Sequence, residues 1–188
     1  MTDLVLDSLQ RRMRTMHGLY YQATGSMTIE HVNHFEREGV LPIAFSLFHY
    51  TNMEDASFML ISGMTPIWNE EWQARVRMTV NDHGKHRTVD EMIHQRIGDL
   101  DAFAEYMRAV YSRTLDWLAG LDPAELDRVV ITRPFPPQIA STFSARVAGE
   151  QGLTVLDGVE CWLYQHGLRH MGEIEMARGL VGLGGMTS

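Results

Sequence analysis

The sequence contains a single cysteine and has no long apolar run. One cysteine excludes an intrachain disulfide, and we expect Cys161 to be a structural thiol on the side of its helix that faces away from the histidines described below. No run approaches the ~20 apolar residues that span a bilayer, and acidic residues interrupt the first apolar run, which argues against a signal peptide. We therefore expect a cytoplasmic protein that does not bind membranes.

Positive charge is also scarce in this chain. Sixteen Lys and Arg residues against 24 Asp and Glu residues give a formal net charge of −8 at pH 7. Such a charge is unfavourable for binding phosphate backbones, so we expect no nucleic-acid partner. The length of 188 residues, with 45% hydrophobic and 21% charged residues, is typical of a globular protein. We predict one domain that spans residues 1–188.

Four long segments have the periodicity of amphipathic helices, which predicts an all-α four-helix bundle. The first runs from a cap at Thr2 or Asp3 to Gly25, and we expect His17 to be partly exposed at the border of its stripe. Its stripe consists of Val5, Leu9, Met13, Met16 and Tyr20. The second runs from Pro42 to Gly63, with a stripe formed by Phe45, His49, Met53, Ala56 and Leu60.

The third and fourth helices are predicted from their caps. Thr88 and Glu91 form a capping box that we expect to open the longest helix, which stops at Asp122-Pro123. Thr154 precedes the last helix, which ends in the glycines of residues 182–185.

Long connections join these helices. Residues 25–41 form a polar connection, and residues 64–87 contain Trp68 and Trp72, which we expect to roof a cleft. The prolines of residues 127–152 predict an irregular segment or a short strand pair over one end of the bundle.

The last helix carries polar groups inside its apolar stripe. His166 and His170 lie one turn apart near the middle of the stripe, and Glu173 lies beside them. Burying such groups without partners would cost roughly 1 to 3 kcal/mol each. A divalent metal ion would compensate this cost, because two histidines at this spacing project toward a common point.

The second helix repeats this pattern, since His49 is centred in its apolar stripe. We therefore predict a metal site formed by His49, His166 and His170. The pairs His31/His34 and His83/His86 also have ligand spacing, but neither lies on an apolar helical face, and we expect neither to bind the metal. Three imidazoles leave an open position on the ion, as in catalytic sites.

A histidine in the second helix followed by His166-Gly-Leu-Arg-His170-Met-Gly172-Glu173 in the fourth resembles the DinB-like superfamily of metal-binding bundles. The resemblance covers nearly the whole chain. It implies a four-helix bundle of DinB-like type, a homodimer, and a metal-dependent enzyme, since the superfamily includes thiol-dependent transferases and isomerases. Glu173 stands where the family usually has Gln, so a carboxylate there is expected to orient a ligand, act as a base or bind the ion.

We expect a small-molecule substrate and a divalent cation, with zinc or nickel favoured over iron or manganese. The leading prediction is an enzyme that uses a low-molecular-weight thiol as cosubstrate, because a metal would ionise a thiol in its open position. The alternatives are a metal-dependent hydrolase with Glu173 as a catalytic base, and a non-catalytic protein that binds metal or a small ligand. Apolar faces of the first and third helices are also expected to support a homodimer.

Overall fold

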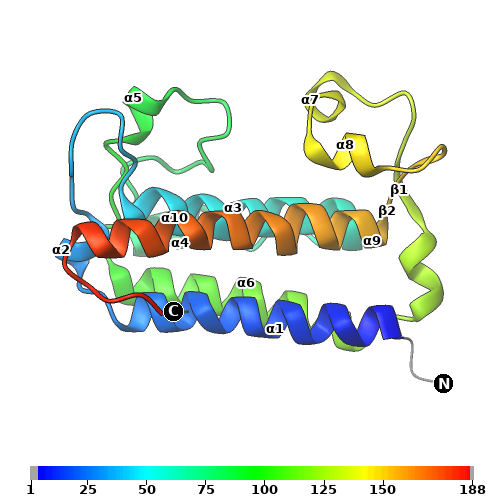
Figure 1. Ribbon diagram of the computed structural model, residues 1–188, viewed down its shortest axis with the longest axis horizontal. Helices are drawn as coiled ribbons and strands as arrows, with labels where there is room; N and C mark the ends of the chain where they lie inside the picture. The colour runs from blue at the N-terminus through cyan, green and yellow to red at the C-terminus, as the bar shows by residue number, and fades with distance from the viewer. Residues whose placement is uncertain (1–3, 187–188) are drawn as a thin grey trace.

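Four long helices form the body of the computed structural model, which describes residues 4–186. They are α1 (Leu4–Gly25), α3 (Ile43–Ser62), α6 (Leu100–Ala119) and a C-terminal run made of α9 (Val155–Gly158), the π-helical η2 (Val159–Gln165) and α10 (His166–Leu180). Figure 1 shows α3 and α10 in one layer and α1 and α6 in the other. The all-α four-helix bundle predicted from the sequence is confirmed.

Short elements cover the connections between these helices. They are α2 (Ile29–Val32), α4 (Glu70–Val76), α5 (Val89–Met92), η1 (Pro123–Asp127), β1 (Val129–Thr132), α7 (Pro137–Ala140), α8 (Phe143–Val147) and β2 (Gly152–Thr154). Strands β1 and β2 pair antiparallel at the end of the bundle where α9 begins (Figure 1). The loops that carry α5 and those that carry α7 and α8 rise from the same side of the α3–α10 layer (Figure 1).

The longest predicted helix is in fact two helices. The capping box of Thr88 and Glu91 is present, but it opens only the single turn of α5. Asp99 caps α6 by accepting a hydrogen bond from the Ala102 backbone at 3.0 Å. The backbone of Gly98 passes so close to Arg77 that a Cβ on this glycine would lie 2.7 Å from the Arg77 Cβ. The prediction of one helix from Thr88 to Asp122 is therefore wrong.

The predicted helix stripes are confirmed in part. Leu9, Met13, Met16 and Tyr20 of α1 are buried, but Val5 is 46% exposed. The predicted caps Thr2 and Asp3 lie outside the described residues. Helix α3 starts after Pro42 and ends at Gly63, whose φ of 77° is the left-handed conformation that glycine favours.

Helix α3 is buried on nearly all sides, because α6, η2 and α10 pack against it and α1 reaches it through the stacked rings of Tyr20 and Tyr50. Its predicted stripe from Phe45 to Leu60 is not a core stripe along its whole length, since Leu60 is 46% exposed. Within residues 4–186, no helix is both long and apolar enough to cross a membrane.

Candidate metal centre

The three histidines predicted from the apolar stripes come together in space. His49 comes from α3, and His166 and His170 come from α10. One ligand nitrogen from each lies within 4.8 Å of the other two. The Nε2 atoms of His166 and His170 are 3.0 Å apart. Two nitrogen ligands of one zinc ion lie about 3.3 Å apart at ordinary Zn–N bond lengths, so the three side chains could hold a metal ion.

The other side of each imidazole is held by an acceptor. The Nδ1–H of His49 donates to the carbonyl oxygen of His83. The Nδ1–H of His170 donates to Glu173 Oε2 at 2.7 Å, and the His166 ring has a hydrogen bond with the Trp162 backbone. Metal-binding histidines are typically oriented in this way by a carboxylate or a carbonyl group. With Nδ1 protonated, neutral His170 presents a lone pair at Nε2, where a cation would be stabilised.

Two of the three histidines, His49 and His166, favour the neutral form. Burial, with a smaller contribution from nearby His170, lowers the pKa of His49 to about 4. Burial and the neighbouring His170 and His49 lower the pKa of His166 to about 2. Metal ions bind the neutral imidazole, so protons compete weakly for these two ligands at pH 7.

Glu173 is tied to His170 rather than free. Its Oε2 atom accepts hydrogen bonds from the His170 ring and from Ser46 Oγ, the latter at 2.9 Å. Partial burial by itself raises the pKa of Glu173, but the His170 and Ser46 hydrogen bonds and the charge of Arg169 outweigh it and lower the pKa. Glu173 therefore contacts the Nδ1 edge of His170, whereas His166 faces the Nε2 edge.

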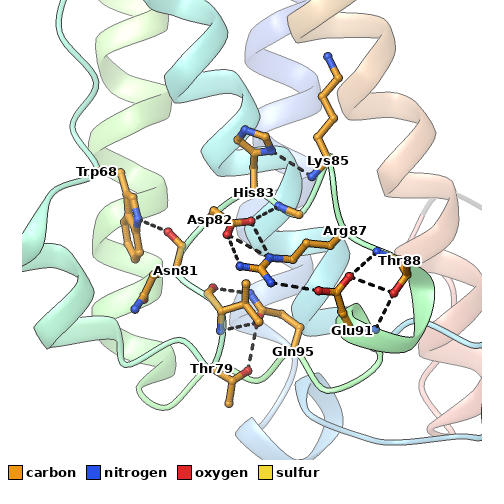
Figure 2. Close-up of polar contacts among 12 residues, drawn as sticks. Trp68, Thr79, Asn81, Asp82, His83, Lys85, Arg87, Thr88, Glu91 and Gln95 are labelled. Carbon is orange, nitrogen blue, oxygen red and sulfur yellow. Dashed lines mark hydrogen bonds and ion pairs between the residues drawn. The ribbon is translucent and has the colours of Figure 1, made fainter. Parts of the chain in front are cut away.

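The loop that supplies the His83 carbonyl is braced by its own side chains (Figure 2). The Gln95 side chain accepts from the Val80 N–H at 2.9 Å and donates to the Val80 carbonyl at 3.0 Å. Asp82 accepts from the Arg87 guanidinium at 2.7 Å and from the Gly84 N–H at 2.9 Å. These contacts hold the backbone around His83, and sequence patterns gave no signal for a role of this carbonyl.

The rival histidine pairs do not join the three-histidine cluster. His31 accepts from the Thr28 N–H as part of the capping box of α2, and His34 contacts Glu36 at 3.1 Å. His83 and His86 instead line a cavity beside the cluster.

This cavity has a volume of about 540 Å³ and is bordered by α3, η2, α8 and the loop around His83. His49 and His166 lie in its wall, together with Met53, Leu60, Phe143, Trp162 and Cys161. Trp68 and Trp72 do not roof it, contrary to the prediction, and pack against Tyr106 with ring centroids 4.8 and 5.6 Å away.

Cys161 lines the same cavity, so the prediction that it faces away from the histidines is wrong. The prediction assumed an α-helix, whereas residues 159–165 are π-helical. Hydrogen bonds from i to i+5 change which residues share a face, and Cys161 precedes His166 by five positions. Burial, together with the charges of Asp157 and Glu160, raises the pKa of Cys161 to about 11.

His17 was also predicted wrongly, because it is buried and not partly exposed. Its Nε2 atom lies 3.0 Å from Glu54 Oε2, and its ring stacks on Tyr111 at 4.0 Å between centroids. The partner lies on α3, so the pattern of α1 alone gave no signal for this contact.

Comparison with known proteins identifies the family. The sequence pattern of the DinB superfamily matches residues 12–174. The chain belongs to the DinB superfamily. A conserved protein of Enterococcus faecalis has the same fold, with a TM-score of 0.75 and 14% identity over 96% of this chain and 99% of that chain. No curated protein matches the sequence. The family assignment confirms the resemblance carried by His49 and the His166–Glu173 segment, and this DinB superfamily member has a three-histidine cluster at the wall of its cavity.

Proposed function

We propose that this protein is a divalent-metal-dependent enzyme whose ion is held by His49, His166 and His170. The observation that carries the proposal is the set of three converging imidazoles, each fixed by an acceptor on its other side, at the wall of a 540 Å³ cavity. A divalent ion bound there would supply the positive charge that lowers the pKa of a thiol or a water molecule. Imidazole ligands favour zinc or nickel over manganese.

The reaction that we favour is a transfer or isomerisation that uses a low-molecular-weight thiol. The cavity is large enough for a small cosubstrate beside the histidines. Cys161 is a poor substitute for an external thiol, because its raised pKa keeps it protonated at neutral pH and only the thiolate is a strong nucleophile. The nucleophilic sulfur is therefore supplied by the cosubstrate.

Glu173 acts in this proposal as a positioning residue. Its hydrogen bond to His170 Nδ1 keeps a proton on that nitrogen and leaves Nε2 free as a ligand atom. Ser46 holds the carboxylate in place from α3. The same contacts speak against Glu173 as the base of a hydrolase, because its bonded oxygen already has two partners away from the Nε2 edge.

A spectroscopic titration tests the thiol proposal. Glutathione, bacillithiol or mycothiol added to the cobalt-substituted protein should produce sulfur-to-metal charge-transfer absorption, because ligation needs the ionised sulfur. Absence of this absorption, together with metal-dependent cleavage of simple esters or amides, would replace the thiol reaction with hydrolysis. Absence of both responses would favour a non-catalytic binding protein.

We also propose that the protein forms a homodimer. The recess between α1 and α6, lined by Tyr21, Leu100 and Met107 among others, supports this proposal as a surface that a second copy could cover. A monomer mass by light scattering at tens of micromolar would contradict it.

A further inference from the structure

The cavity beside the three histidines is positively charged, although the chain as a whole is acidic. Lys85 and Arg169 line it together with His83 and His86, and no Asp or Glu is found among the described residues of its wall. The formal net charge of the chain is −8, and Lys85 is its single lysine. The one ammonium group on a side chain of this protein therefore lies at this cavity.

Neither cation of the cavity forms an ion pair with a carboxylate in the described part of the chain, although Arg169 lies near enough to Glu173 to lower the pKa of that carboxylate. Within residues 4–186, no carboxylate lies within ion-pair distance of Lys85 or Arg169. Asp82, three residues before Lys85, is engaged by Arg87, and Figure 2 shows the Lys85 side chain extending away from that pair. At the surface recess beside Tyr164, by contrast, both arginines are paired, Arg11 with Asp7 and Arg12 with Glu160.

Arg169 is close enough to the histidines to act on their charge. Its guanidinium contributes to lowering the pKa values of both His166 and Glu173. Lys85 is two residues from His83, whose carbonyl accepts a hydrogen bond from His49. The backbone N–H of Lys85 donates to Nδ1 of the His83 ring at 3.1 Å. The two cations thus reach the cavity from different elements, one from the loop and the other from α10.

Apolar side chains form much of the remaining wall. Met53 and Leu60 come from α3, and Ile139 and Phe143 come from the segment that carries α7 and α8. Phe143 is 52% exposed, which is high for a phenylalanine and leaves its ring available to a ligand. Cations beside such a surface suit a molecule that has both an acidic group and an apolar part.

We propose that the cavity binds a small amphipathic anion, with its acidic group at Lys85 and Arg169 and its apolar part against Leu60 and Phe143. This proposal gives a substrate class to the site of the proposed function, and as a statement about a substrate it rests on that function. The binding step itself uses only side chains of this chain and does not require the metal. It can therefore be measured on metal-free protein.

The probe is 8-anilinonaphthalene-1-sulfonate, and its uncharged counterpart is N-phenyl-1-naphthylamine. Binding to metal-free protein is followed by dye fluorescence for the parent chain, Lys85→Gln, Arg169→Gln and the double variant. Each substitution should weaken binding of the sulfonate about two- to fivefold, and the double variant about tenfold, which is the size expected for exposed charge contacts. The affinity of the neutral dye should change less than twofold.

Arg37→Gln is the matched control. Arg37 is exposed and also lacks an ion pair within the described part of the chain, but it lines neither this cavity nor the recess between α1 and α6. This variant should bind the sulfonate as the parent does. Octanoate or octyl phosphate should displace the sulfonate more strongly than 1-octanol, and the better of the two identifies the acidic group as a carboxylate or a phosphate.

Equal affinity of the parent and the double variant for the sulfonate, with circular dichroism showing both folded, would overturn the proposal. So would an equal loss in Arg37→Gln, because binding would then follow overall charge. A protein that binds no metal but shows the expected losses would refute the proposed function and leave the anion site standing. A protein that binds metal, but whose affinity for the sulfonate does not change in the Lys85 and Arg169 variants, would refute the anion site and leave the proposed function standing.

Discussion

Two clusters of histidine and carboxylate lie in the same bundle, and they differ in what surrounds them. His17 and Glu54 are 0% exposed between α1, α3 and α6. Glu54 accepts hydrogen bonds from His17, Tyr50 and Thr114, so both of its oxygens have partners. His49, His166 and His170 instead meet beside a cavity whose wall includes His49 and His166, and Glu173 lies next to them.

The comparison separates a structural role from a chemical one for the same residue types. In the enclosed cluster, both side chains are fully buried and both carboxylate oxygens already accept hydrogen bonds. In the cavity-wall cluster, the carboxylate and the carbonyls hold the Nδ1 side of the site, and two Nε2 atoms face each other at 3.0 Å. We therefore expect the first cluster to stabilise the fold, and the proposed ligand binding belongs to the second.

The largest effect is expected from Glu54→Ala. Removing this carboxylate leaves His17, Tyr50 and Thr114 without their acceptor in the core, which should cost about 3 to 5 kcal/mol of unfolding free energy. Urea denaturation of the metal-free protein measures this loss. Glu173→Ala is the matched control and should cost much less, since its side chain is 46% exposed. An equal loss in both variants would remove the distinction between the clusters.

A smaller effect is expected from Gly167→Ala, which acts where the two clusters adjoin. A Cβ on Gly167 would lie 2.3 Å from Met16 Sδ and 2.7 Å from Tyr50 Cζ. Such overpacking should cost about 1 to 3 kcal/mol and should also weaken metal binding, because His166 is the adjacent residue. Gly172→Ala in the same helix meets no atom within 4 Å and should be neutral or slightly stabilising. Equal stabilities of the two variants would contradict the packing argument.

The third comparison is a separation of the two clusters by pH. The folded pKa values of His49 and His166, about 4 and about 2, lie below the ordinary 6.5, so the unfolded chain takes up their protons first. The metal-free protein should therefore lose stability as the pH falls from 6.5 toward 4. Burial alone would raise the pKa of Glu54, but interactions with His17, Tyr50 and Thr114 lower it below 4.5, so its contribution is lost only below that pH.

A double variant with His49→Gln and His166→Gln tests whether these two histidines cause the loss of stability between pH 6.5 and 4.5. Its urea midpoint should change less than that of the parent between pH 6.5 and 4.5 and should still fall below pH 4.5. An identical pH profile for the two proteins would show that these histidines are not buried in the neutral form.

Much of the fold could be predicted from sequence, because burial imposes helical periodicity on a single segment. The stripe from Leu9 to Tyr20 is recognisable for this reason. The caps at Gly63 and Thr154 are recognisable from residue type, because glycine favours the left-handed conformation and a threonine side chain can accept from a free backbone N–H. The prediction from periodicity was wrong at Gly98 and Asp99, because the apolar spacing continues although the chain leaves one helix and starts another. Helix α6 starts there because Asp99 caps it.

The site was predictable only where the signal lay within one helix. His49, His166 and His170 each interrupt an apolar stripe, and that local anomaly located the cluster. The buried partner of His17 lies on another helix, and the position of Cys161 depends on a π-helical stretch that hydrophobic spacing does not reveal. The His83 carbonyl and Lys85 reach the site from a loop, and Ser46 reaches Glu173 from another helix, so a pattern in sequence could not identify them.

The metal content of the protein purified without a His tag tests the central claim most directly. Elemental analysis should find about one divalent ion per chain, little or none in His170→Ala, and parental content in the double variant His83→Gln with His86→Gln, which keeps the His83 backbone carbonyl. Glu173→Gln keeps an acceptor oxygen and should also retain the ion, and circular dichroism should show all variants helical. Full occupancy in His170→Ala, or no metal in the parent protein after incubation with zinc or nickel, would contradict the assignment of a three-histidine metal centre.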